Sequence, residues 1–253
     1  MKKIDRVGLI KYNKFGSKMT IIKYRNANDI DILFEEYNWI TKHSSYNNFK
    51  NGLIKCPYDK SIYGLGYIGE GKYKSRKDGK MTKCYSEWIG MMQRCYDSVS
   101  LEKNSTYKDC EVEEYFFNFQ NFGKWFEKNY YECNEEQMHL DKDILVKGNK
   151  VYSPDTCIFV PQTINKLFVK CDKARGSLPI GIYYDKERDK YTAGCHFNGK
   201  RKFLGRFDTP EEAFQAYKHF KENYIKQVAD EYKDLIPEKL YNAMYEYEVE
   251  IED

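Results

Sequence analysis

The sequence predicts a modular α+β protein, because strand-like and helix-like patterns follow one another along its 253 residues. Short β-branched segments come first, aromatic residues at helical spacing follow, and strands and helices alternate in the last part. At roughly 100–200 residues per domain, the length fits two domains or three small ones. Aromatic residues form 17% of the chain, which is enough apolar ring surface to build cores and excludes wholesale disorder.

Residues 1–63 are predicted to form a small β-domain. Residues 19–25 and 29–35 are β-branched and partly alternating, and the residues between them have turn chemistry. Residues 46–57 are expected to be the strand that closes this domain. Residues 64–83 are rich in glycine and lysine and are expected to be a linker or an exposed loop, because no apolar helix follows these glycines as it would in a nucleotide-binding motif.

The middle of the chain, residues 84–170, is predicted to begin with two helices. Apolar residues recur at helical spacing over 85–97, and aromatic residues do so over 112–128. We interpret this aromatic stripe as core. Residues 137–168 then show the pattern of a strand, a loop, a second strand and a helix.

Residues 178–226 are predicted to form a three-stranded sheet followed by a helix. The strand patterns cover 181–188, 190–197 and 200–207. Thr209 is expected to cap the helix, because Pro210 suits the first helical position and Glu212 lies three residues after the cap, as in a capping box.

The net charge of +3 hides an uneven distribution. Residues 1–83 contain 18 basic and 8 acidic residues, 84–169 contain 9 and 14, 170–226 contain 13 and 8, and 227–253 contain 2 and 9. Two basic segments therefore flank an acidic centre, and an acidic tail follows. Its last residues, 245–253, alternate apolar residues with glutamate and are expected to form an edge strand or to stay flexible. Basic surfaces attract phosphate backbones, and clustered carboxylates bind hard divalent cations, although either segment could be an ordinary solvated face.

Eight cysteines are present, but none forms a C-x-x-C pair and only four histidines accompany them. We therefore expect reduced thiols and no zinc site. No apolar run approaches the ~20 residues of a membrane helix, and the N-terminus has no long apolar stretch or small-residue cleavage site. The expected location is the cytoplasm, with no membrane partner.

Residues 139–165 place Asp141 followed by Lys142 at a strand end, Asn149 in the loop and Asn165 in the helix after the second strand. This arrangement resembles the ββα-metal finger of HNH endonucleases. The resemblance implies that Asp141 and Asn165 hold one Mg²⁺ or Mn²⁺ ion, which polarises a phosphate and stabilises the leaving oxygen. It gives Asn149 the role of positioning the loop or the phosphate. Taken alone, Asp141 and Asn165 would be turn and cap residues.

The base is the uncertain part of this site, because the HNH family has a histidine where this chain has Lys142. A solvated lysine has a pKa of about 10.4 and stays protonated at neutral pH. Lys142 accepts a proton only if burial lowers its pKa by several units, and otherwise it would bind the scissile phosphate. His139, two residues before Asp141 on the same strand face, and Asp143 are the other candidates.

A second spaced set of residues covers 181–224: Gly181, Ile182, Tyr191, Ala193, Gly199, Lys200, Leu204, Gly205, Phe207, Thr209, Glu211, Glu212, Ala213, Ala216 and Tyr217. It resembles the APETALA-type DNA-binding domain of ethylene-response factors, although Tyr191 stands where tryptophan is usual. The resemblance implies a sheet that lies in the major groove and long cationic side chains that reach guanine edges or phosphates. The candidates are Lys186, Arg188, Lys190, Lys200, Arg201, Lys202 and Arg206.

The two resembled domains occur together in HNH nucleases of phages and mobile elements. The expected function is therefore a metal-dependent, HNH-like endonuclease that nicks or cleaves double-stranded DNA. A homodimer would suit it, because one finger cuts one strand. The basic region 1–83 is expected to be a second DNA-contacting patch. The alternative is a catalytically inactive DNA-binding regulator, or a phage counter-defence protein whose acidic tail binds a host protein. Lys142, which replaces the histidine base, favours the inactive alternative. The Asp141–Asn165 metal pair favours the enzyme.

Overall fold

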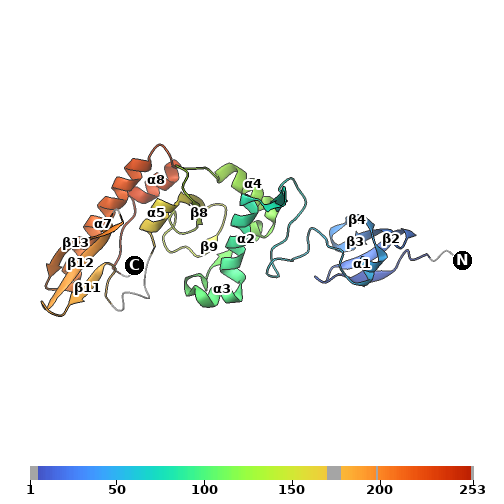
Figure 1. The fold of residues 1–253 in the computed structure, drawn as a ribbon, viewed down its shortest axis with the longest axis horizontal. Helices are drawn as coiled ribbons and strands as arrows, with labels where there is room; N and C mark the ends of the chain where they lie inside the picture. The colour runs from blue at the N-terminus through green and yellow to red at the C-terminus, as the bar shows by residue number, and fades with distance from the viewer. Residues whose placement is uncertain (1–4, 170–177, 198, 252–253) are drawn as a thin grey trace. The chain divides into compact units, whose positions relative to one another are not determined.

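The computed structural model describes residues 5–169, 178–197 and 199–251 (Figure 1). This part of the chain contains seven α-helices and several small sheets, which confirms the predicted α+β class. No helix within it is both long and apolar enough to cross a lipid bilayer.

The chain divides into two compact units, and each unit contains two separate stretches of sequence. The first unit is Met1–Lys128 with Lys150–Pro154, and the second is Asn129–Asn149 with Asp155–Asp253. The division between them passes through the segment 84–170, which the sequence had suggested as one module.

A four-stranded antiparallel sheet, in the order β1-β2-β3-β4, forms the N-terminal part of the first unit. Its strands are β1 (Ile10–Tyr12), β2 (Lys18–Asn26), β3 (Asp29–Phe34) and β4 (Trp39–Ser44), with a 3-10 turn, η1 (Glu35–Tyr37), before β4. β2 and β3 confirm the two predicted strands. Their core consists of Met19, Ile21, Ile30, Ile32, Phe34, Phe49, Ile54 and Cys56.

The segment 46–57 is not the closing strand that the sequence predicts. It begins with a short helix, α1 (Tyr46–Lys50), because the Ser45 hydroxyl accepts a backbone N–H of the first turn. Gly52, at a φ of 65°, follows the helix, and the chain continues as a loop. The sheet is closed by β4 instead.

Residues 64–83 are only partly the exposed linker that their composition predicts. The Gln120 side-chain amide donates to the carbonyl oxygens of Ile68 and Tyr73, and its oxygen accepts the N–H of Tyr73. These bonds attach the first half of the segment to the helical part of the unit. The second half forms a hairpin of β5 (Arg76–Lys77) and β6 (Lys80–Met81).

Helices around an aromatic core form the rest of the first unit. The elements are α2 (Lys83–Tyr96), α3 (Ser98–Lys103), η2 (Ser105–Tyr107), β7 (Glu111–Val112), η3 (Glu114–Phe117), α4 (Phe119–Asn129) and β9 (Val151–Tyr152), which pairs in parallel with β7. α2 confirms the helix predicted over 85–97. The helix predicted over 112–128 is split at Asn118, because its Oδ1 accepts the N–H of Gln120 and starts α4 anew. The predicted core stripe is buried at Phe116, Phe119, Phe122 and Trp125.

The second unit begins with a strand, loop, strand and helix in the predicted order. The elements are β8 (Met138–Asp141), β10 (Ile158–Pro161), antiparallel to β8, and α5 (Gln162–Leu167). Asp141 lies opposite Ile158, and Met138 lies opposite Pro161. α5 therefore begins at the end of the hairpin that is away from Asp141.

A three-stranded antiparallel sheet follows, in the order β11-β12-β13. The elements are β11 (Ile182–Asp185), β12 (Lys190–Phe197), β13 (Lys200–Phe207) and then α7 (Pro210–Tyr232) and α8 (Glu238–Tyr245). The predicted cap is confirmed, because the Thr209 hydroxyl accepts the N–H of Glu212. The Glu212 carboxylate returns to the N–H of Asp208, one residue before the cap.

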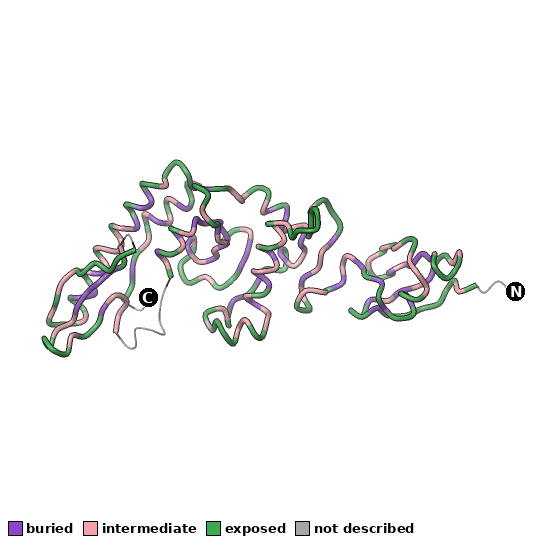
Figure 2. Tube along the Cα trace, in the orientation of Figure 1, coloured by how far each residue is buried: buried purple, intermediate pink, exposed green. Residues whose placement is uncertain are grey.

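The long helix α7 belongs to two cores of the second unit. Its first half packs on the sheet, in a core that contains Ala213, Phe214 and Tyr217. Figure 2 shows the continuous buried run of the central strand β12 in this core. Its second half packs with β10, α5 and α8 through Ile225, Val228 and Ala229. The sheet and the β8–β10 hairpin are thus attached to one helix.

Residues 245–253 are neither the edge strand nor the flexible tail that the sequence predicts, as far as they are described. Val249 is buried, its N–H donates to Glu222, and its carbonyl accepts from Lys218 of α7. Lys147 donates to the Glu248 carbonyl. The backbone of this segment is therefore docked on α7, although the segment is rich in acidic residues. The docking buries its apolar residue Val249 in the core.

Candidate functional site

The two faces of the β11–β13 sheet have different surroundings. On one face, Tyr217 of α7 packs with Ile182 in a common core. Tyr183, the next residue, points the other way and is 40% exposed. Tyr183 pairs with Thr192 and Thr192 pairs with Arg206, so these three residues share the face opposite α7. We call it the open face.

A β-bulge decides which basic residues reach the open face. Gly194 pairs with Phe203 whereas Ala193 pairs with Gly205, so one extra residue is inserted into β13. Gly205 has a φ of 146°, which favours glycine. Phe203 and Arg206 are three positions apart and would face opposite sides of a regular strand. The bulge brings both to the open face.

Two arginine–aromatic pairs lie on this face. The Arg201 guanidinium carbon is 4.4 Å from the centroid of the Tyr183 ring, and that of Arg206 is 5.0 Å from the centroid of the Phe203 ring. Phe203 is 55% exposed although it is a large apolar residue. Stacking of this kind orients a guanidinium group while its other N–H donors remain able to bind, although Arg206 Nε also forms a 3.5 Å ion pair with Asp185. We call Tyr183, Arg201, Phe203 and Arg206 the open-face patch.

Thr192 lies on the central strand in the middle of this patch. It is 0% exposed, and its hydroxyl has no hydrogen-bond partner in the part of the chain that the structure describes. A buried hydroxyl without a partner costs about 1–3 kcal/mol. Gly194 is the next residue on the same face, and a Cβ there would lie 3.0 Å from Arg201 Nε. The Arg201 guanidinium group therefore lies against β12 at Gly194, where a side chain would crowd it.

Sequence reasoning named the two arginines but missed Tyr183, Phe203 and Thr192. Only cations had been considered as DNA contacts. Aromatic residues next to basic ones on the predicted strands were the available signal, because guanidinium groups stack on aromatic rings.

Two of the predicted DNA-binding residues lie on the other face. Lys202 Nζ is 4.6 Å from the centroid of the Phe220 ring of α7, so this side chain reaches toward the helix. Lys200 shares that face, because it is two residues earlier on β13. These lysines are separated from the open-face patch by the sheet itself.

The remaining three predicted residues lie at the β11–β12 end of the sheet. Lys186 is exposed in the turn between these strands. Arg188 forms a 3.2 Å ion pair with Asp185, and Lys190 forms one with Asp208. Ion pairs this exposed contribute little stability, so these cations can exchange their partner for a phosphate at small cost.

Asp141 ends β8 and shapes the loop that follows. Its Oδ1 accepts the N–H of Asp143 at 2.8 Å and that of Ile144 at 2.7 Å. The pKa of Asp141 is raised to about 6, mainly by burial and secondly by the charge of the neighbouring Asp143 carboxylate. The site therefore favours a compensating positive charge near this carboxylate.

The residue in the position of the expected base is buried. Lys142 is 6% exposed, and its Nζ is 3.3 Å from Asp143 Oδ2. Asn149 closes the loop, because its Nδ2 donates to the Lys142 carbonyl at 2.6 Å. His139 and Asp141 are the two half-buried residues of β8 and share one face of it. Of these groups, an imidazole is the one that ordinarily titrates near neutral pH.

Asn165 is the fourth residue of α5 and is half-buried. α5 follows Pro161, which pairs with Met138 at the end of the hairpin opposite to Asp141. The Asp141 carboxylate accepts its two hydrogen bonds from the backbone of its own loop. Hydrogen bonds thus join Asp141 to the loop after β8, whereas Asn165 lies on α5. Among the residues that the structure describes, no hydrogen bond joins the two that the sequence predicts as a metal pair.

A second group of possible metal ligands lies in the first unit. Within the described ranges, Asp29, Asp31 and His43 are the one group of three such side chains, with ligand atoms within 4.8 Å of one another. Arg25 already binds it, at 2.8 Å from Asp29 and at 2.9 and 2.7 Å from the two oxygens of Asp31. Its hydrogen bonds lower the pKa of Asp31 to about 2. We interpret this group as a structural ion-pair cluster.

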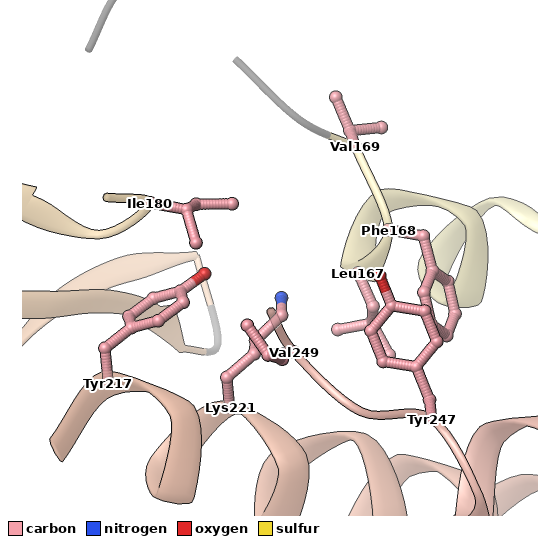
Figure 3. A pocket seen from close by; sticks show the side chains of 8 residues that line it. All are labelled: Leu167, Phe168, Val169, Ile180, Tyr217, Lys221, Tyr247 and Val249. Atoms are coloured by element: carbon pink, nitrogen blue, oxygen red, sulfur yellow. The ribbon is translucent and has the colours of Figure 1, made fainter. Parts of the chain in front are cut away.

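A small pocket lies in the second unit between α5, α7 and the docked C-terminal segment (Figure 3). Lys221 rises from α7, and its amine points between Tyr217 and Tyr247. The other lining residues are apolar: Leu167, Phe168, Val169, Ile180 and Val249. Burial lowers the pKa of Lys221. This apolar lining offers no carboxylate to hold a metal and no pair of groups for acid–base chemistry.

No family model matches this chain, and the comparisons with curated proteins and with solved structures give no significant match. The geometry of its own residues is therefore the basis for assigning a function.

Proposed function

We propose that this protein binds double-stranded DNA with the open face of its β11–β13 sheet. The observation that carries the proposal is the open-face patch, where each of two guanidinium groups lies over an exposed aromatic ring. Guanidinium groups bind guanine edges in bidentate fashion, and apolar side chains contact thymine methyl groups. The resemblance of residues 181–224 to the APETALA-type domain supports the same partner.

The position of each basic residue on the sheet would decide whether it contacts bases or phosphates. Arg201 and Arg206 would reach base edges from the open face, where the exposed Phe203 ring offers an apolar contact. Lys186 and Arg188, at the end of the sheet, suit phosphate contacts, which position the protein without reading sequence. Lys202 faces α7 and would take no part in reading bases.

Replacing Arg201 and Arg206 by alanine is expected to weaken duplex binding by about 1–3 kcal/mol per residue, which is about 5- to 150-fold for each. The measurement is fluorescence anisotropy of the full chain with a duplex selected from a random pool. The control is Lys200→Ala with Lys202→Ala, which removes the same charge from the other face. If the control pair weakens binding as much as the arginine pair, the open face is not the contact surface.

A second candidate function is metal-dependent nicking of the bound DNA by the loop after β8. The observation that favours it is the raised pKa of Asp141 beside Asp143, because a divalent cation would neutralise both carboxylates. Carboxylate oxygens are the donors that Mg²⁺ prefers, so Asp141 and Asp143 fit such an ion. A bound cation would polarise the scissile phosphate. His139 would accept the proton of the attacking water, since Lys142 is buried beside Asp143.

Asp141→Asn is expected to abolish nicking of supercoiled plasmid in Mg²⁺ or Mn²⁺. Asparagine keeps the oxygen that accepts the two loop N–H groups, but it removes the negative charge that a cation needs. Activity of the unaltered protein should fall as the pH is lowered, because burial raises the pKa of Asp141 and protons then compete with the metal for its carboxylate.

The control for this experiment is Lys142→Gln, which should retain nicking if His139 is the base. His139→Ala should then reduce the rate by about 10²–10⁴-fold. If the unaltered protein cleaves no DNA with either metal, the loop is a scaffold and the protein is a DNA-binding regulator. Binding of a host protein through an acidic tail has less support, because Val249 and its neighbours are docked on α7.

A further inference from the structure

The β5–β6 hairpin of the first unit carries a dense positive charge. Lys77 and Lys80 flank a tight turn at Asp78 and Gly79, both of which have positive φ values, as the preferred two-residue hairpin turn requires. The cations of this hairpin are all exposed: Lys74, Arg76, Lys77, Lys80 and Lys83. Asp78 is the single acidic residue between 74 and 83.

Both ends of the hairpin are attached to helices of the same unit. On one side, Thr82 donates its N–H to the Ser75 carbonyl and its hydroxyl to the Lys74 carbonyl, and the same hydroxyl caps α2. On the other side, Tyr73 is bonded through its backbone to Gln120 of α4. An isolated two-stranded hairpin is marginally stable, so these attachments give the arm a defined base.

The charge arrangement works against the stability of the hairpin itself. Lys77 lies directly opposite Lys80 in the ladder, and like charges in such a pair repel. Five of the ten residues 74–83 are basic, and their mutual repulsion is unfavourable in the free arm and is relieved beside a polyanion. Most of these side chains are lysines. A lysine binds phosphate as a single positive charge and does not form the bidentate hydrogen bonds by which arginine recognises bases.

We infer that the β5–β6 hairpin is a second DNA contact, which binds the phosphate backbone of the duplex without reading its sequence. This inference rests on the proposed DNA-binding function and extends it to the first unit. Binding of Lys77 and Lys80 to phosphates releases counterions, so each contact adds about 0.9 to the slope of log affinity against log salt concentration. The open-face patch provides the sequence preference for DNA. The hairpin adds electrostatic affinity for the duplex, which decreases as the salt concentration rises.

The test is a salt titration of duplex binding by the full chain and by Lys77→Gln/Lys80→Gln. The double variant is expected to lower the salt slope by about 1.8. Removal of the Lys77–Lys80 repulsion should leave its melting temperature unchanged or higher, which shows that the protein still folds. The matched control is Lys124→Gln/Lys128→Gln, which removes two exposed lysines from α4 in the same unit. It should keep the slope of the unaltered protein.

The outcomes separate this inference from the proposed function. If the unaltered protein binds duplex and the hairpin variant keeps its full slope, the hairpin inference is wrong and the function of the sheet stands. If the hairpin and α4 variants lower the slope equally, the effect is one of net charge and the inference also fails. If the unaltered protein binds no duplex even at low salt, the proposed function fails and the hairpin inference fails with it.

Discussion

Replacing Trp88 by alanine is expected to lower the free energy of unfolding of the first unit by about 3–5 kcal/mol. The indole is fully buried, and its ring centroid lies 5.3 Å from that of Phe119. Its Nε1 donates to the Phe116 carbonyl at 2.7 Å. Alanine would leave a cavity and a buried carbonyl oxygen without this donor, and both effects destabilise the fold.

Denaturant unfolding of the full chain, followed by circular dichroism, measures this effect. Gln93→Ala is the matched control, because Gln93 is exposed on the same helix and its replacement should change stability by less than about 0.5 kcal/mol. Equal stability of the two variants would mean that the indole is not part of the core.

Leu240→Ala is expected to lower the free energy of unfolding of the second unit by about 2–5 kcal/mol. Leu240 lies on α8 and is fully buried in the core that also contains Ile164 of α5 and Val228 of α7. The variant should also weaken duplex binding near its melting temperature, because α7 supports the sheet as well as this core.

The control is the neighbouring Lys239→Ala, since Lys239 is exposed on α8. The melting temperature and the denaturant midpoint of this variant should match those of the unaltered protein. The expectation of a separate acidic tail makes the opposite prediction, in which Leu240→Ala is as harmless as Lys239→Ala.

The C-terminal sheet shows how far local sequence signals reach. β12 and β13 begin and end at the predicted residues, and α7 begins after the predicted cap at Thr209. These signals are strong because alternation, a capping hydroxyl and a proline at the first helical position act over a few residues. The same kind of reasoning failed at 46–57, where Ser45 caps a short helix in place of the predicted strand.

The end of α7 depends on contacts that are distant in sequence. The acidic composition of 227–253 predicted a solvated tail, yet Val228, Ala229 and Leu240 are buried. Their partners on β10 and α5 lie some 60–80 residues earlier in the chain, as Ile158 and Ile164 show. The composition of a helical segment is dominated by its exposed residues. One apolar face is enough to join a core, and the average composition does not show that face.

By itself, the sequence determined the chemical types at the candidate sites: seven cations around the C-terminal sheet, and carboxylates with a lysine at the end of β8. Only the tertiary structure decided which of them act together. The bulge in β13 between Phe203 and Gly205 turns Arg206 to the face of Arg201, and tertiary packing buries Lys142. Strand register and burial arise from cooperative packing of segments far apart in sequence, which no local pattern of residues records.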